Sequence, residues 1–160
     1  MTDILLYWRD YQQNWAEQSA GERELTWHSN AGLFTELHPG DRLWLVTSGH
    51  NLKAQAHQAP QAGFLVAVWQ VQQVQPNPGD DPAYPSADYR YRVTADASAS
   101  ILLDEPVFVD HIVRPNGRDQ AKAIGAFLQG PRRLTDEKVR LLRTAAGPLM
   151  ARHYLAGRRV

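Results

Sequence analysis

The segment from Phe64 to Val74 constrains the fold of this chain more than any other part of the sequence. Its first half, Phe64–Val68, is continuously apolar, which is typical of a strand that is buried on both faces. Its second half, Trp69–Val74, partly alternates between apolar and polar residues, as strands do near the rim of a sheet. We therefore predict that this segment is the longest strand and that it runs from the core to a sheet rim.

Shorter segments with strand character lie on both sides of this one. They are Leu5–Trp8, Leu43–Thr47, Tyr89–Thr94, Ile101–Leu103 and Val107–Val109. Polar or proline-containing loops separate them, and no regular alternation of strands with helices is present, which disfavours a parallel sheet. We predict a single α+β, mainly β domain over residues 1–160, built as a small mixed barrel of five or six strands with peripheral helices.

The best-defined helix is predicted near the C-terminus. Thr135 is a favourable N-cap, and Leu134 before it can pack against Val139 as a hydrophobic staple. Gly147, followed by a proline, ends the helix. A second short helix is predicted over about Leu149–Ala156.

Several classes of chemistry are excluded by what the sequence lacks. Cysteine is absent, which removes disulfides, thiolate metal sites and thiol nucleophiles. No phosphate-binding loop, dinucleotide fingerprint or hydrolase motif is present, and no two of the six histidines are three or four residues apart. We therefore expect no metal, no cofactor and no catalytic residue. The absence of a long apolar run and of an N-terminal signal predicts a cytoplasmic protein without a membrane partner.

The formal net charge is zero, but the charges are unevenly distributed. Residues 1–110 hold 6 basic against 14 acidic side chains, whereas residues 111–160 hold 11 basic against 3 acidic ones. A basic C-terminal third is suited to contacts with phosphates. The alternative is that the two parts pack together and neutralise each other.

Trp27 lies in a polar segment that we interpret as a loop before a short helix over Leu33–Leu37. Ser29 or Asn30 could provide the N-cap of that helix. An indole ring there could stack on a nucleic acid base, while hydroxyl, amide and free backbone N–H groups supply hydrogen bonds. Alternatively, Trp27 only packs beneath the loop.

Two further residues could belong to the same site. Ser48 follows the strand Leu43–Thr47, and a hydroxyl at a strand end can contact the edge of a base. Trp69 lies where the long strand approaches the rim of the sheet, so it could border a pocket. A Ser-Gly pair is also an ordinary turn, which is the other interpretation of Ser48.

The order of these segments resembles the EVE family of the PUA-like superfamily, whose relatives include ASCH and YTH domains. Leu6-Tyr7-Trp8 is similar to the family's first strand, and Trp27 to its loop tryptophan. The segments Leu37–Leu45 and Gly63–Val71 are similar to the two strands that follow, and Leu134–Leu142 to the terminal helix. The resemblance covers most of residues 4–82 and, more loosely, residues 127–146.

What this resemblance implies is a twisted β-barrel that binds DNA or RNA and holds a plain or modified base in an aromatic pocket. The expected base-pocket residues are Trp27, Ser29, Asn30, Ser48, Trp8 and Trp69. The expected phosphate contacts are Arg114, Arg118, Arg132 and Arg133. Any cleavage of the nucleic acid would then come from a partner nuclease or another effector protein.

Two alternatives from other functional classes remain open. Some ASCH-type domains hydrolyse small modified nucleosides with a lysine, a threonine and a glutamate, for which Lys53, Thr47 and a nearby carboxylate are the candidates here. In a protein-interaction module, the aromatic residues would instead form a peptide groove. Weak dependence of binding on salt would favour that last alternative.

Overall fold

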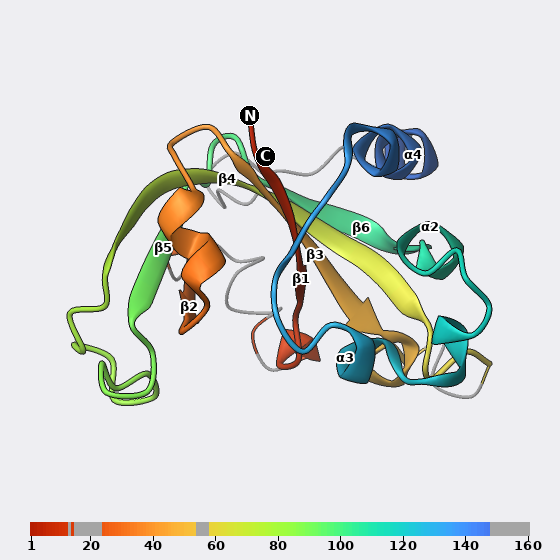
Figure 1. Ribbon diagram of the computed structural model, residues 1–160, viewed down its shortest axis with the longest axis horizontal. Coiled ribbons are helices and arrows are strands. Elements are labelled where there is room, and N and C mark those ends of the chain that lie inside the picture. Colours follow the sequence, from red (N-terminus) through yellow and green to blue (C-terminus); the bar gives the residue numbers. More distant parts are fainter. Residues whose placement is uncertain (13, 15–23, 54–57, 148–160) are drawn as a thin grey trace.

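The computed structural model describes residues 1–12, 14, 24–53 and 58–147, and within these ranges the chain forms a seven-stranded sheet. The strand order is β2 (Thr26–Ser29), β5 (Tyr91–Ala95), β4 (Gly63–Pro76), β3 (Arg42–Ser48), β1 (Asp3–Tyr7) and β7 (Arg132–Arg133), and β6 (Ile101–Phe108) also pairs with β4. Figure 1 shows the sheet as a strongly curved ribbon, with β2 and β5 at one end and α2 (Asp110–Val113) and α4 (Asp136–Ala146) at the other. The predicted α+β, strand-rich class is confirmed.

Strand β4 (Gly63–Pro76) is the longest described strand, as its apolar pattern predicts. One of its edges pairs antiparallel with β3 (Arg42–Ser48), which pairs in parallel with β1 (Asp3–Tyr7). Its other partners are β5 (Tyr91–Ala95) and β6 (Ile101–Phe108). The two separate strands predicted within residues 101–109 are therefore one strand.

The segment around Trp27 is a strand, which corrects the prediction of a loop. Strand β2 (Thr26–Ser29) pairs antiparallel with β5, so that Trp27 lies opposite Val93. A 3-10 helix, η1 (Gly32–Glu36), follows with Ala31 at its N-cap position. Ser29 Oγ accepts a hydrogen bond from the backbone N–H of Ala31, so neither Ser29 nor Asn30 is the cap.

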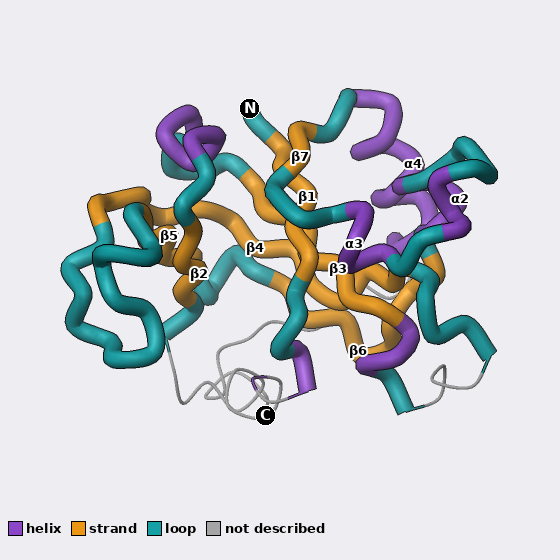
Figure 2. Tube along the Cα trace, turned by 60° about the horizontal axis from the view of Figure 1, so that its bottom comes forward, coloured by secondary structure: helices purple, strands orange, loops and turns teal. Residues whose placement is uncertain are grey.

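The sheet separates two hydrophobic clusters, because successive side chains of a strand point to opposite faces. Ile4 and Leu6 of β1 belong to the first cluster, which η1 covers through Phe34. Leu5 of β1 and Trp44 of β3 belong to the second cluster. Figure 2 shows from another direction that α2 (Asp110–Val113) and α4 (Asp136–Ala146) lie together at one side of the sheet, away from β2 and β5.

Helix α4 begins and ends where the sequence predicts. Thr135 is its N-cap and its side chain accepts a hydrogen bond from the backbone N–H of Lys138, while Gly147 follows the last turn. Leu134 and Val139 are buried in the second cluster. The helix predicted over residues 149–156 lies outside the described residues. None of the helices in the described ranges is long and apolar enough to cross a membrane.

Candidate aromatic binding site

A cavity of about 580 Å³ opens where the end of β1 meets β2, the middle of β4 and the segment after α3 (Ile124–Phe127). The loop between β4 and β5 completes its wall through Tyr84 and Tyr89. This volume lies within the range of about 300–1,000 Å³ that is usual for small-molecule sites in proteins. Six of the fourteen wall residues are Tyr or Trp, and Arg9, Asp10, Asn14, His28 and Gln129 add polar groups, so the cavity suits a flat ligand with polar edges.

Three tryptophans that are distant in the sequence converge on this cavity. The ring of Trp69 meets the rings of Trp8 and Trp27 edge to face, with centroid distances of 5.9 Å and 6.2 Å. Trp8 and Trp69 are buried in the first cluster, whereas Trp27 is partly buried. Trp27 is therefore the member of the trio that retains ring surface for a ligand. Trp15 lies outside the described residues.

Tyr84, Tyr89 and His28 are wall residues that the sequence analysis did not select. The imidazole of His28 stacks on the ring of Tyr84 at 4.2 Å and 8°, and Tyr84 meets Tyr89 edge to face at 5.2 Å. The side-chain amide of Asn77 fixes this loop by donating hydrogen bonds to the carbonyls of Tyr84 and Tyr89. The only signal in the sequence was the number of tyrosines in and after the proline-rich loop.

His28 brings a polar atom without a partner to this aromatic wall. Its Nε2 is buried and makes no hydrogen bond to the protein. Burial, followed by the nearby positive charge of Arg92, lowers the pKa of His28, and the carboxylates of Asp81 and Asp80 oppose this effect only in part. The imidazole is therefore neutral near pH 7, so that one ring nitrogen can donate a hydrogen bond and the other can accept one.

This lowered pKa predicts a loss of stability in acid. Below the ordinary value of 6.5 the unfolded chain binds a proton on His28 that the folded chain does not, so the free energy of unfolding falls with pH. We expect the wild-type protein to lose more stability than His28→Phe between about pH 7 and about pH 5, because phenylalanine keeps the stack on Tyr84 but does not titrate. Urea denaturation at several pH values measures this difference. Parallel stability curves for the two proteins would contradict it.

Tyr7 forms another part of the wall, and its hydroxyl is hydrogen-bonded to two residues that do not line the cavity. Its hydroxyl donates to Ser48 Oγ at 3.3 Å and accepts from the side-chain amide of Asn51 at 3.4 Å. On the opposite side, a Cβ at Gly125 would lie 2.9 Å from the Tyr7 ring, so only glycine lets α3 approach β1 this closely. Tyr7 therefore fixes the distance between β1 and α3 across the cavity.

The three polar residues expected to contact a base edge do not line the cavity. Ser48 is buried behind Tyr7, and the Ser29 hydroxyl accepts the N–H of Ala31. Asn30 is exposed beyond the end of β2. On β2, Thr26, Trp27 and His28 border the cavity, whereas Ser29 at the end of the strand is hydrogen-bonded to Ala31. Besides the tyrosines, the polar residues of the wall are Arg9, Asp10, Asn14, Thr26, His28 and Gln129.

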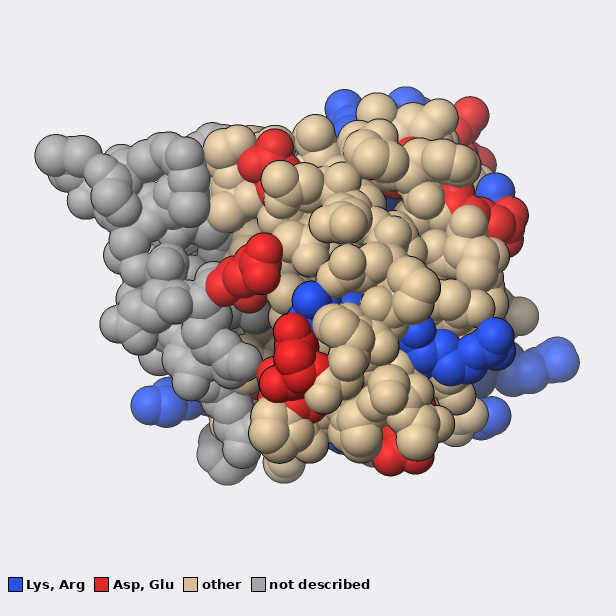
Figure 3. Space-filling view, turned by 90° about the vertical axis from the view of Figure 1, so that its left-hand side faces the viewer, with Lys and Arg blue, Asp and Glu red and all other residues tan. Residues whose placement is uncertain are grey.

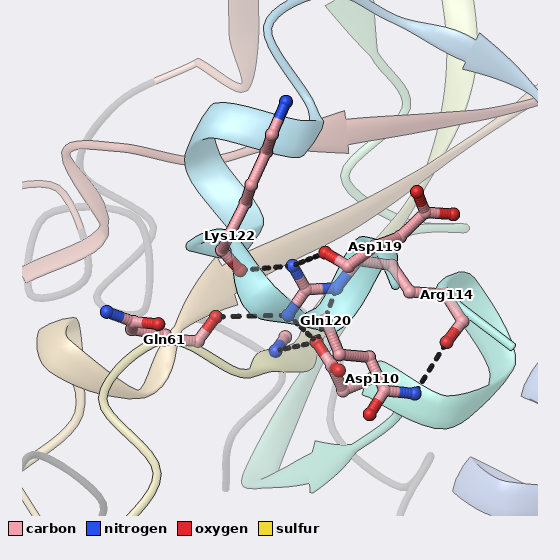
Figure 4. A network of polar contacts seen from close by, with 7 residues as sticks. Gln61, Asp110, Arg114, Asp119, Gln120 and Lys122 are labelled. Carbon is pink, nitrogen blue, oxygen red and sulfur yellow. Dashed lines mark hydrogen bonds and ion pairs between the residues drawn. The ribbon is translucent and has the colours of Figure 1, made fainter. Parts of the chain in front are cut away.

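Arg114 is a structural residue, which corrects its expected role as a phosphate contact. Its side chain is 1% exposed and pairs with the buried carboxylate of Asp110 at 2.6 Å. Figure 4 shows the guanidinium enclosed by the loop that follows α2. The remaining N–H groups donate to backbone carbonyl oxygens of Asp119, Lys122 and Gln61. No N–H group of this guanidinium is left to point into solvent toward a phosphate.

The other three expected phosphate contacts are exposed but differ in their partners. Arg133 forms an ion pair with Glu36 at 2.6 Å, and Arg118 lies in the loop before η3 (Asp119–Ala121). Arg132 lies on β7 (Arg132–Arg133), which pairs with β1, and its guanidinium stacks over Phe127. Figure 3 shows that acidic and basic side chains are interspersed on the face at the β2–β5 end, so this face is not a continuous basic surface.

The residues considered for nucleoside hydrolysis are not gathered at the cavity. Thr47 is buried, its hydroxyl donates to the carbonyl of Trp8, and it accepts from Asn51. Neither Thr47 nor Lys53 borders the cavity. Among the described residues, no group of three or more metal-binding side chains is close enough to hold an ion.

Comparisons with known proteins identify relatives in fold only. No family model matches the sequence, and no curated protein matches it. Solved structures with a similar fold include a Rhodopseudomonas palustris protein determined by NMR (16% identity, TM-score 0.55, 93% of this chain and 95% of that chain). A Pseudomonas putida protein is similar at 9% identity and a TM-score of 0.55, over 89% of this chain and 98% of that chain. A hypothetical protein from Leishmania major is similar at 9% identity and a TM-score of 0.51, over 92% of this chain and 96% of that chain.

Proposed function

We propose that this protein binds a nucleic acid base, plain or modified, in its aromatic cavity. The observation that carries this proposal is the convergence of Trp8, Trp27 and Trp69 with three tyrosines around one cavity of about 580 Å³. Trp27 provides the stacking surface, and the neutral imidazole of His28 belongs to the same wall. Moving a base out of its stack in a nucleic acid costs a few kcal/mol of free energy, and stacking of the base on an aromatic side chain offsets about 1–3 kcal/mol of this.

We infer further that the sheet is a PUA-like barrel of the EVE type. In support, the segments that resemble EVE domains coincide with β1, β2, β3 and β4. Three of their four tryptophans, Trp8, Trp27 and Trp69, meet at the cavity, whereas Trp44 lies in the second cluster. The curvature of β4 carries β5 and β2 over the first cluster (Figure 1). A pocket at the same position as in EVE domains accounts for the resemblance of segments that lie far apart in this sequence.

The test is a calorimetric titration of the protein with nucleosides and with short single-stranded oligonucleotides. The ligands are the four common deoxynucleosides, their N6-methyladenine and 5-methylcytosine forms, and oligonucleotides that carry each base once. We expect at least one base to bind both as nucleoside and within a strand, with tighter binding of the strand that weakens as salt rises. Absence of binding to every member of this panel would contradict the proposal. Binding of peptides with little salt dependence would favour the protein-interaction alternative.

A further inference from the structure

The guanidinium of Arg132 is exposed, but two contacts hold it in place. Its guanidinium carbon lies 4.0 Å from the centre of the Phe127 ring, and one N–H group donates to the Phe127 carbonyl at 2.9 Å. Stacking and one hydrogen bond fix the plane of the group, while the side chain remains exposed. A fixed guanidinium loses less conformational freedom when it binds an anion, so it is a better phosphate ligand than a mobile one.

Arg132 also lacks a carboxylate partner among the described residues. By contrast, carboxylates pair with most arginines whose side chains are described: Arg9 with Asp10, Arg42 with Asp3, Arg92 with Asp80, Arg114 with Asp110, Arg133 with Glu36 and Arg140 with Glu137. The charge of Arg132 is therefore fixed in place but not neutralised. An anion is the ligand that would complete its interactions.

The position of Arg132 connects it to the cavity. Phe127, which anchors it, ends α3, and the next two residues, Leu128 and Gln129, line the cavity together with Gly125 of the same helix. The opposite wall belongs to the loop between β4 and β5, residues 77–90, in which three aspartates outnumber one arginine, so its net charge is negative even though Asp80 is paired with Arg92. At the end of β1, the charges of Arg9 and Asp10 oppose each other as an ion pair. The charge around the cavity is therefore asymmetric, and the α3 side is the one that suits a phosphodiester backbone.

We propose that Arg132 binds a backbone phosphate next to the base held in the cavity, so that the ligand is a nucleic acid strand that crosses α3. This inference rests on the proposed function, because it concerns the same site. It adds the direction in which the strand leaves the cavity and a contact that a free nucleoside cannot make. Among the basic residues of the C-terminal third, Arg132 is the one that we assign to the ligand in the cavity.

The experiment compares Arg132→Gln with Arg143→Gln, which removes the same charge from the exposed side of α4. Each variant is titrated with the best-binding deoxynucleoside and with the oligonucleotide that contains it, at several salt concentrations. Arg132→Gln should leave the nucleoside affinity within twofold of wild type and lower the oligonucleotide affinity by about tenfold. It should also reduce the slope of log affinity against log salt by about 0.7, which corresponds to one phosphate contact on a single strand. Arg143→Gln should match the wild type with both ligands.

The possible failures are distinguishable. If the wild-type protein binds neither probe, the proposed function itself is wrong. If it binds both probes and the affinities of Arg132→Gln equal those of Arg143→Gln, the proposed base site is retained and the proposed phosphate contact is wrong. Equal losses of nucleoside and oligonucleotide affinity in Arg132→Gln would mean that Arg132 only supports α3, which also overturns the inference. Binding of the nucleoside without binding of the oligonucleotide would overturn it as well.

Discussion

Replacing Arg114 with Met should lower the free energy of unfolding by about 3–5 kcal/mol, because it leaves a buried carboxylate without its counter-charge. Asp110 would then keep the backbone N–H of Gly63 as a hydrogen-bond donor, at 2.8 Å, but no cation. The backbone carbonyls of Asp119, Lys122 and Gln61 would lose their donor at the same time. A loss of this size is a large part of the 5–15 kcal/mol that stabilises a typical domain.

Urea denaturation of the wild type, of Arg114→Met and of the double variant Arg114→Met/Asp110→Asn measures this effect. The double variant should recover part of the loss, because asparagine keeps an acceptor for the Gly63 N–H without burying a charge. A loss below about 1 kcal/mol in Arg114→Met, combined with weaker oligonucleotide binding, would contradict the structural role. It would instead restore the phosphate contact that was expected from the sequence.

Replacing Trp27 with Ala should weaken binding of the preferred base by roughly 10- to 100-fold, because stacking on an aromatic ring contributes about 1–3 kcal/mol per base. Trp27→Phe should retain most of the affinity, since it keeps a ring at the same place. Phe108→Ala is the matched control, because it removes an exposed ring that pairs with Phe64 and His111 away from the cavity. Calorimetric titration with the nucleoside measures all three variants.

Two outcomes would contradict this role of Trp27. Unchanged nucleoside affinity in Trp27→Ala would show that the ring does not contact the ligand. Equal losses in Trp27→Ala and Phe108→Ala would show that the assay reports general stability and not a contact at the site. Circular dichroism of each variant separates a binding defect from unfolding.

The sequence predicts the strands and the last helix because local patterns determine them. The continuous apolar run at the start of β4 reflects its burial, and Thr135 caps α4 by a hydrogen bond within one turn. The sequence alternation in β5 does not match its burial, because Val93, Thr94 and Ala95 are all buried. Trp27 was assigned to a loop because its neighbours are polar. Its pairing with Val93 of β5 is a contact between residues far apart in the sequence, which no local pattern contains.

The same limit explains which site residues could be predicted. Trp8, Trp27 and Trp69 were selected, and the sheet brings them together around the cavity. Ser48 and Arg114 were predicted to contact the ligand because of their chemical type. Both side chains are buried, and each binds a partner inside the protein. His28 and Tyr84 were missed because their stack joins β2 to a loop about fifty residues later along the chain.

The most direct test of the cavity as a base-binding site is NMR observation of the tryptophan indole N–H signals during titration with the preferred nucleoside. Trp44 is an internal control, because its Nε1 donates to Asp3 at 2.9 Å and its ring is buried in the second cluster, on the other face of the sheet. We predict that the indole signals of Trp8, Trp27 and Trp69 shift in proportion to occupancy, with the largest change at Trp27, while that of Trp44 does not move. A shift of Trp44 without a shift of Trp27, or no shift in any of these signals at saturating nucleoside, would contradict the account.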